Sequence, residues 1–150
     1  MTVELRIPFQ TQVRAAAIQL LTDFRHETAL QLQIYPARPR SIKPPCAFVD
    51  KLRESIAFDA LRQRVVQADV VVIHGLFDSA EAAGQRDYFV DNFIDWCSDR
   101  QAAAGGSTVL EPRATEDDPS YVPEWLPADE QRSYYATTII LEGFSGGGYR

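Results

Sequence analysis

The sequence has little sulfur, no long apolar run and no leader-like start. Its two cysteines, Cys46 and Cys97, have no CxxC spacing, so we expect reduced core thiols rather than a disulfide or a thiolate metal site. No apolar stretch approaches the ~18–20 residues that a membrane-spanning helix needs. Residues 1–10 lack the basic segment and apolar core of a secretory signal. We therefore expect synthesis in the cytosol and no contact with a membrane.

Motifs that carry catalysis or hold cofactors are also missing. There is no P-loop and no Rossmann fingerprint, so the sequence predicts no phosphate cradle. Residues 143–147 match GxSxG, but a nucleophile elbow needs a helix after its serine, and only five residues follow Ser145. The triad histidine of that fold follows the serine, whereas both histidines here precede it. We expect no catalytic residue, no metal and no cofactor, and we interpret His74 as a strand-end histidine with a local hydrogen bond.

The composition is that of a globular protein, with 45% hydrophobic and 24% charged residues. It predicts a single domain over residues 1–150, with an extended proline-rich loop over 36–45 and a flexible glycine-rich tail over 145–150. The charge is uneven along the chain. Residues 1–75 carry ten basic and seven acidic residues, a net of +3, whereas residues 76–150 carry five and fourteen, a net of −9. Such halves suit contacts between copies of the same chain, unless they interleave in the fold and the asymmetry disappears.

Hydrophobic periodicity predicts helices and strands along the whole chain. The expected elements are a helix over 9–24, a strand over 30–35, a strand over 46–58 that bends near Arg53, a buried central strand over 65–73, a helix ending near Arg100, a short strand over 108–115, irregular chain over 116–129 and a last strand over 133–144. Asp78 and Glu81 have the spacing of a capping box at the start of the second helix. The predicted fold class is α/β (α+β), a small mixed, mainly antiparallel sheet of four to five strands with two helices packed on one face.

The proline-rich loop is the first candidate surface. Its four prolines in ten residues exclude a helix or an internal strand and leave an extended, stiff segment. The loop carries Arg38, Arg40 and Lys43 and no acidic residue. A loop of this length is often functional, so we expect these cations to contact a neighbouring molecule.

The second candidate surface is a row of aspartates in the second predicted helix, at Asp87, Asp91, Asp95 and Asp99. Residues four apart are neighbours on a helix, so each like-charged pair costs about 0.2–0.5 kcal/mol, and the row costs about 1 kcal/mol at most. No cation lies four residues from any of them, and the last two lie near the negative end of the helix dipole. The row is either an ordinary solvated face or a surface for something outside the helix, such as a basic neighbour or a polyanion that it repels.

Several stretches resemble a known family. They are Tyr35-Pro-Ala-Arg-Pro with Pro44-Pro-Cys-Ala-Phe-Val-Asp50, Val71-Val-Ile-His-Gly-Leu-Phe-Asp-Ser-Ala-Glu81, Gln85-Arg-Asp-Tyr-Phe-Val-Asp91, and Tyr134-Tyr-Ala-Thr with Leu141-Glu-Gly-Phe144. In this order they resemble the tail terminator family of long-tailed bacteriophages, also called tail completion or head–tail joining proteins. The similarity covers most of residues 9–144. None of these motifs is catalytic, so their joint order alone carries the resemblance.

The resemblance implies a structural virion protein rather than an enzyme. Family members form a hexameric ring that caps the completed tail tube and provides the head-attachment surface, and DNA passes through it without sequence-specific binding. The implied partners are copies of the chain, the tail tube protein and a head-completion or connector protein. The implied location is the head–tail junction of the virion, after assembly in the host cytoplasm. An alternative is another head–tail connector or minor virion component of similar fold.

The resemblance assigns no role to individual residues. Arg38, Arg40 and Lys43 remain candidates for a subunit or tail-tube interface. The aspartate row either lines the channel, where it keeps DNA from adhering, or meets these cations on a neighbouring subunit.

Overall fold

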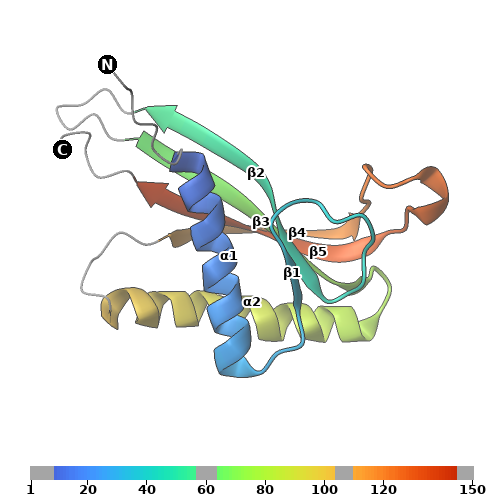
Figure 1. Cartoon of the computed structure of the whole chain (residues 1–150). Helices are drawn as coiled ribbons and strands as arrows, with labels where there is room; N and C mark the ends of the chain where they lie inside the picture. The colour runs from blue at the N-terminus through green and yellow to red at the C-terminus, as the bar shows by residue number, and fades with distance from the viewer. Residues whose placement is uncertain (1–8, 57–63, 104–109, 145–150) are drawn as a thin grey trace, which may run out of the picture.

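Five strands form one sheet, and two long helices pack against it. The structure is a computed structural model that describes residues 9–56, 64–103 and 110–144. The strand order is β1-β2-β3-β5-β4, in which β1 and β2 are parallel and the other neighbouring pairs are antiparallel. The elements in Figure 1 are α1 (Phe9–Thr28), β1 (Gln33–Tyr35), β2 (Cys46–Ile56), β3 (Arg64–Leu76), α2 (Ala80–Ala103), β4 (Glu111–Tyr121), the 3-10 helix η1 (Ala128–Glu130) and β5 (Tyr134–Phe144). The predicted mixed, mainly antiparallel sheet is confirmed.

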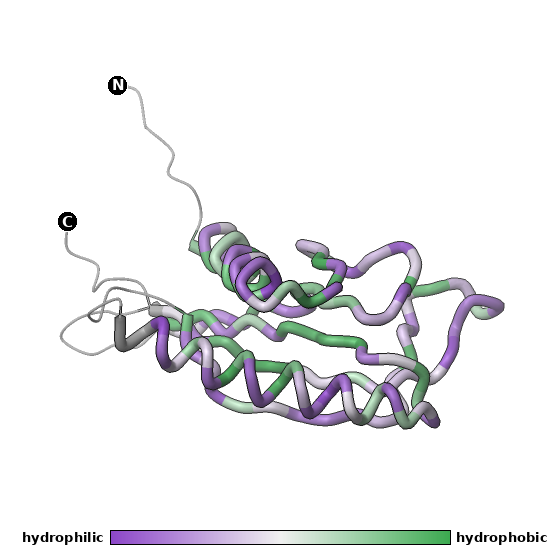
Figure 2. The backbone as a smooth tube through the Cα atoms, turned by 90° about the horizontal axis from the view of Figure 1, so that it is seen from below, coloured by the Kyte–Doolittle hydropathy of each residue, from purple (hydrophilic) through white to green (hydrophobic). Residues whose placement is uncertain are grey.

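The middle strand β3 is buried on both faces, as its nearly continuous apolar run predicted. Val70 and Val72 point to the face that both helices cover, whereas Val71 and Ile73 point to the opposite face. Figure 2 shows hydrophobic residues along the strands in the middle of the molecule. The alternation along β3 therefore builds two cores, one on each face of the sheet.

The helices contact each other as well as the sheet. The ring centroid of Phe24 in α1 lies 5.4 Å from that of Phe89 and 5.2 Å from that of Phe93, both in α2. Nearby, Arg100 Nη2 pairs with Asp23 Oδ2 at 3.0 Å. In Figure 2, α1 is seen nearly end-on while α2 runs lengthwise, so the helices cross steeply. Because their side chains join one core, both helices lie on the same face, as predicted.

Loops rather than helices cover the opposite face of the sheet. Ile42, from the proline-rich loop 36–45, and Trp125, from the segment between β4 and β5, pack against its buried side chains. The Trp125 ring lies 5.4 Å from the Phe48 ring, and its Nε1 donates a hydrogen bond to the Pro39 carbonyl at 2.8 Å. Loop 36–45, which we call the basic loop, is thus held on the face that the helices leave uncovered.

The predicted start of the second helix was wrong by one residue. The α2 helix begins at Ala80, and the hydroxyl of Ser79, not Asp78, accepts a hydrogen bond from the Ala82 N–H at 3.4 Å. The preceding strand extends to Leu76, and the Ser79 N–H closes the following turn on the Leu76 carbonyl at 3.0 Å. That turn places Ser79 at the capping position, so Glu81 falls one position short of a capping box.

The predicted irregular chain over 116–129 was wrong in its first part. Strand β4 runs from Glu111 to Tyr121, although it contains Pro112 and Pro119. It lies at the edge of the sheet and pairs only with β5, so a missing backbone N–H costs no pairing on its outer side. An edge strand tolerates the prolines and acids that predicted a loop.

Two points complete the fold. Within the described part of the chain, no helix is long and apolar enough to cross a membrane. The predictions for the glycine-rich tail over 145–150, for Ser145 and for the break at Gly105 and Gly106 lie outside the described residues.

Candidate assembly surface

The two halves of the chain stay apart in the sheet. Strands β1, β2 and β3 come from the first half, and β5 and β4 come from the second, so the boundary in the sequence becomes a boundary between neighbouring strands. Helix α1 contacts the first group, whereas α2 reaches across β3 to β5 and β4. The strands of the two halves therefore form separate parts of the sheet, but the halves meet elsewhere, because Arg100 pairs with Asp23 and Trp125 lies against Arg38.

The aspartate row lies on the exposed side of α2. The side chains of Asp87 and Asp91 are 73% and 74% exposed, and Asp95 and Asp99 are also exposed. An α-helix turns about 100° per residue, so each step of four residues advances the row by about 40°. The row sweeps across the side of α2 that faces away from the core. Tyr88 lies on the same side and is 55% exposed.

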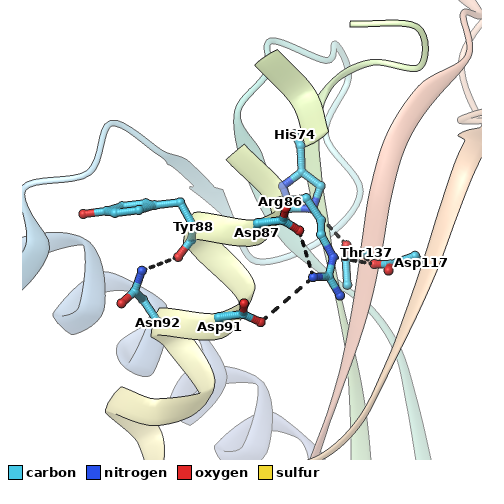
Figure 3. Close-up of polar contacts among 8 residues, drawn as sticks. All are labelled: His74, Arg86, Asp87, Tyr88, Asp91, Asn92, Asp117 and Thr137. Carbon is cyan, nitrogen blue, oxygen red and sulfur yellow. Dashed lines mark hydrogen bonds and ion pairs between the residues drawn. The ribbon is translucent and has the colours of Figure 1, made fainter. Parts of the chain in front are cut away.

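The N-terminal part of this row has a cation that the sequence analysis missed. Arg86 Nη1 lies 3.2 Å from Asp87 and 4.0 Å from Asp91, while its Nε lies 3.0 Å from Asp117 in β4 (Figure 3). A hydrogen bond to Asp117 raises the pKa of Arg86. The sequence did contain a sign of this ion pair, since Arg86 follows the buried Ala82 by four residues and so lies near the buried side of the helix. Such a position requires a charged or polar partner from another element.

The C-terminal part of the row has no such relief. Among the residues that the structure describes, Asp95 and Asp99 make no ion pair, although Arg100 is adjacent to Asp99. Arg100 instead pairs with Asp23 of α1 and lies over the Trp96 ring, 5.1 Å from its centroid. The row therefore has two parts. Asp87 and Asp91 pair with Arg86, and we call them the engaged pair. Asp95 and Asp99 make no ion pair among the described residues, and we call them the unengaged pair.

A buried polar chain lies beneath the engaged pair. His74 Nε2 lies 2.9 Å from Thr137 Oγ1, and that hydroxyl donates to Asp117 Oδ1 at 2.7 Å (Figure 3). Because the hydroxyl proton goes to the carboxylate, the hydroxyl accepts from Nε2–H. The Nδ1 atom of His74 is buried and has no hydrogen-bond partner among the described residues. The sequence predicted a local hydrogen bond for His74; the ring does make a hydrogen bond, but its partner is Thr137 in β5, 63 residues away, so the prediction of a local partner was wrong.

The protonation states in this chain follow from burial and from the hydrogen bonds. Burial lowers the pKa of His74 to about 4, so its imidazole is neutral at pH 7. Burial also acts to raise the pKa of Asp117, but hydrogen bonds from Thr137 and Arg86 outweigh it, and this pKa is lowered. The carboxylate of Asp117 in β4 thus binds Thr137 in β5 and Arg86 in α2, and the hydrogen bond between Thr137 and His74 adds β3 to the network. This network fixes the N-terminal half of α2 against the sheet.

The three cations of the basic loop differ in their contacts. Arg38 Nε lies 2.6 Å from Asp50 Oδ1, and its guanidinium lies over Trp125, 4.9 Å from the ring centroid. The hydrogen bond to Asp50 raises the pKa of Arg38. Arg40 and Lys43 are exposed, and neither side chain makes an ion pair within the described ranges. Arg38 therefore anchors the loop to its own subunit, and the other two cations face solvent.

The cysteines are free and buried, as predicted. Burial raises the pKa of Cys46 to about 11 and that of Cys97 to about 12, so both thiols stay protonated at neutral pH. Over the described residues, no group of three or more His, Cys, Asp and Glu side chains could hold a metal ion.

Comparisons with known proteins add no relative. No family model and no curated protein matches the chain. The resemblance to tail terminators therefore stays a prediction, and the function is argued from the surfaces described above.

Proposed function

We propose that this chain is the structural subunit of a phage tail terminator, a ring that caps the completed tail tube and provides the head-attachment surface. One observation carries the proposal beyond the resemblance. The exposed cations of the basic loop and the exposed aspartates of α2 lie on opposite faces of the sheet, so each subunit presents a basic surface and an acidic surface. Copies of such a subunit attract one another when the acidic part of one meets the basic part of the next.

A ring requires a contact of this unlike kind. When a subunit uses one surface to bind a different surface on its neighbour, the contact is heterologous, and repetition gives a closed ring or an open filament. A subunit of uniform charge repels its copies instead. The segregated charge of this chain supports a head-to-tail ring.

The net charge also suits a ring through which DNA passes. The chain carries a formal net charge of −6, and most of the acidic excess is in residues 76–150. Binding to the phosphate backbone depends on Lys and Arg contacts, so an acidic wall does not retain DNA. This supports passage of DNA without sequence-specific binding.

Electron microscopy of tails tests the proposal. In a phage that carries this chain, deletion of its gene is expected to give overlong tails, because nothing stops the growth of the tube. The alternative function, another head–tail connector, predicts tails of normal length detached from filled heads. Tails of normal length on intact virions would contradict both. Expression of the intact chain from a plasmid is the control, and it must restore normal tails.

A further inference from the structure

We infer that the exposed side of α2 is the docking surface for the basic loop of a second copy of the chain. The inference deepens the proposed function and rests on it, since it names the two surfaces that join neighbouring subunits.

The exposed side of α2 combines one large aromatic side chain with a run of acidic residues. Tyr88 is a large, half-exposed aromatic side chain near the N-terminal end of the aspartate row. Gly84, one turn earlier, has nothing within 4 Å of the position that a Cβ would take, so the helix backbone is open to a partner there. Asp95 and Asp99 follow Tyr88 along the same side and are unengaged within the described chain. Figure 3 shows Tyr88 pointing away from the Arg86 cluster.

The basic loop is held in one position, so its free cations are presented to a partner at little cost in entropy. Arg38 pairs with Asp50 at 2.6 Å, Trp125 holds the Pro39 carbonyl at 2.8 Å, and Arg14 donates to the Pro36 carbonyl. These anchors come from three different parts of the fold. Between and beyond them, the side chains of Arg40 and Lys43 extend into solvent.

The loop cannot neutralise the aspartates of its own subunit. Its Ile42 packs on the sheet face that carries Phe48 and Ile73, whereas α2 packs on the other face through Phe89 and Phe93. The sheet therefore separates the two surfaces. The partner that brings Arg40 and Lys43 to the helix is a second copy, and the contact is heterologous because each copy uses a different face.

The two surfaces are also matched in chemistry. Pro44 of the loop is exposed beside Lys43 and gives the loop an apolar surface that suits the half-exposed ring of Tyr88. With a proline on Tyr88, the cations of the loop reach the acids further along α2. Arg40 and Lys43 then pair with Asp95 and Asp99, the two aspartates of the row that make no ion pair within the described chain.

Sedimentation of the full chain at two salt concentrations tests whether the contact exists. At about 0.01 M salt the Debye length is about 30 Å, and at about 1 M it is about 3 Å. We expect assemblies of several subunits at the lower concentration and dissociation at the higher one. A wild-type chain that remains monomeric at low salt and high protein concentration would overturn the inference.

Charge reversal tests which surfaces are involved. One variant carries Arg40→Glu with Lys43→Glu, and the other carries Asp95→Lys with Asp99→Lys. Each variant alone places like charges across the contact, so we expect its self-association to weaken more than about tenfold. A mixture restores opposite charges at both contacts of an alternating ring, so we expect the mixture to assemble where neither variant does. Failure of the mixture to assemble, or full assembly of either variant alone, would overturn the inference.

Matched controls carry the same charge changes at exposed positions other than the named cations and aspartates. Lys51→Glu with Arg132→Glu matches the loop variant, and Asp129→Lys with Glu130→Lys matches the helix variant; all four residues are exposed. We expect both controls to assemble like the wild type. If they fail as the reversed variants do, net charge rather than the named surfaces governs assembly, and the inference is wrong. Circular dichroism checks that each variant is folded.

The result is separable from that of the proposed function. If the wild type assembles and the charge-reversed variants assemble equally well, the docking surfaces are wrong while the ring proposal stands. If the deletion phage makes tails of normal length, the proposed function is wrong, whatever surfaces join the copies.

Discussion

The two halves of the α2 aspartate row look alike in sequence and differ in structure. Asp87 and Asp91 lie beside Arg86. Arg86 also pairs with Asp117, which accepts a hydrogen bond from Thr137. Asp95 and Asp99 lie two turns further along the same helix and have no cation among the described residues. One repeated residue type therefore has two different environments on the same helix. The first pair belongs to the internal network that holds α2 in place, and the second pair is available to a partner.

The largest expected effect is a dependence of the free energy of unfolding on pH, which comes from His74 beneath the engaged pair. The pKa of His74 is about 4 in the folded protein and 6.5 in its ordinary environment. Between these values the unfolded chain binds a proton that the folded chain does not, so stability falls as pH drops from about 6.5 to about 4. A shift of this size corresponds to about 3 kcal/mol. Urea unfolding at several pH values measures it.

His74→Gln is the control for this pH dependence. Glutamine has an N–H near the position of Nε2 and does not titrate, so the variant should lose the dependence on pH between about 4 and 6.5. The lowered pKa of Asp117 acts at lower pH, below its ordinary value of 3.8, where protonation removes its favourable hydrogen bonds. An unchanged pH profile in His74→Gln would show that His74 is not the titrating group.

Arg86→Met should have an intermediate effect. The variant keeps the aliphatic stem but removes the cation shared by three aspartates, so Asp87 and Asp91 repel each other and Asp117 loses one donor. Its partners are partly exposed, so we expect a loss of about 1 kcal/mol rather than the larger value of a buried pair. Chemical denaturation followed by circular dichroism measures the change. A variant as stable as the wild type would contradict the structural role of Arg86.

The matching change in the unengaged half should have the smallest effect and the opposite sign. Asp95→Asn with Asp99→Asn removes repulsion along the helix and two acids near the negative end of its dipole. We expect the monomer to gain a few tenths of a kcal/mol in stability, about 0.2–0.5 kcal/mol per relieved pair. The same denaturation experiment at low salt, where the charges are not screened, and at a protein concentration low enough to keep the subunits apart, measures the folded monomer. A clear loss of stability would show that these aspartates belong to the internal network after all.

The sequence predicted the elements with strong periodicity better than their ends and contacts. The apolar run 65–73 identified the central strand, and the spacing of Phe89 and Phe93 identified the buried side of α2. It did not predict that the strand ends at Leu76 and moves the helix cap to Ser79. The end of a strand depends on pairing with β5, which is distant in the sequence, so local patterns carry little information about it.

The sequence showed which charged residues the candidate surfaces contain, but not which of them form ion pairs within the subunit. The cations of the basic loop and the aspartates of α2 were visible as charge patterns, but their engagement depends on partners far along the chain. Arg38 is held by Asp50 and Trp125, and Arg86 by Asp117, and no local spacing connects these residues. The edge position of β4 was hidden as well, because its prolines and acids are equally typical of a loop.

By itself, the sequence determined the fold class, the two free cysteines and the opposite charge of the two halves, because composition and periodicity are properties of neighbouring residues. The tertiary structure was needed to show that the strands of the two halves occupy separate parts of the sheet, that the basic loop and α2 lie on opposite faces, and which aspartates make no ion pair among the described residues. These depend on strand order and on contacts between distant segments. A chain of the same composition with its strands interleaved would have lost the charge separation on which the proposed assembly rests.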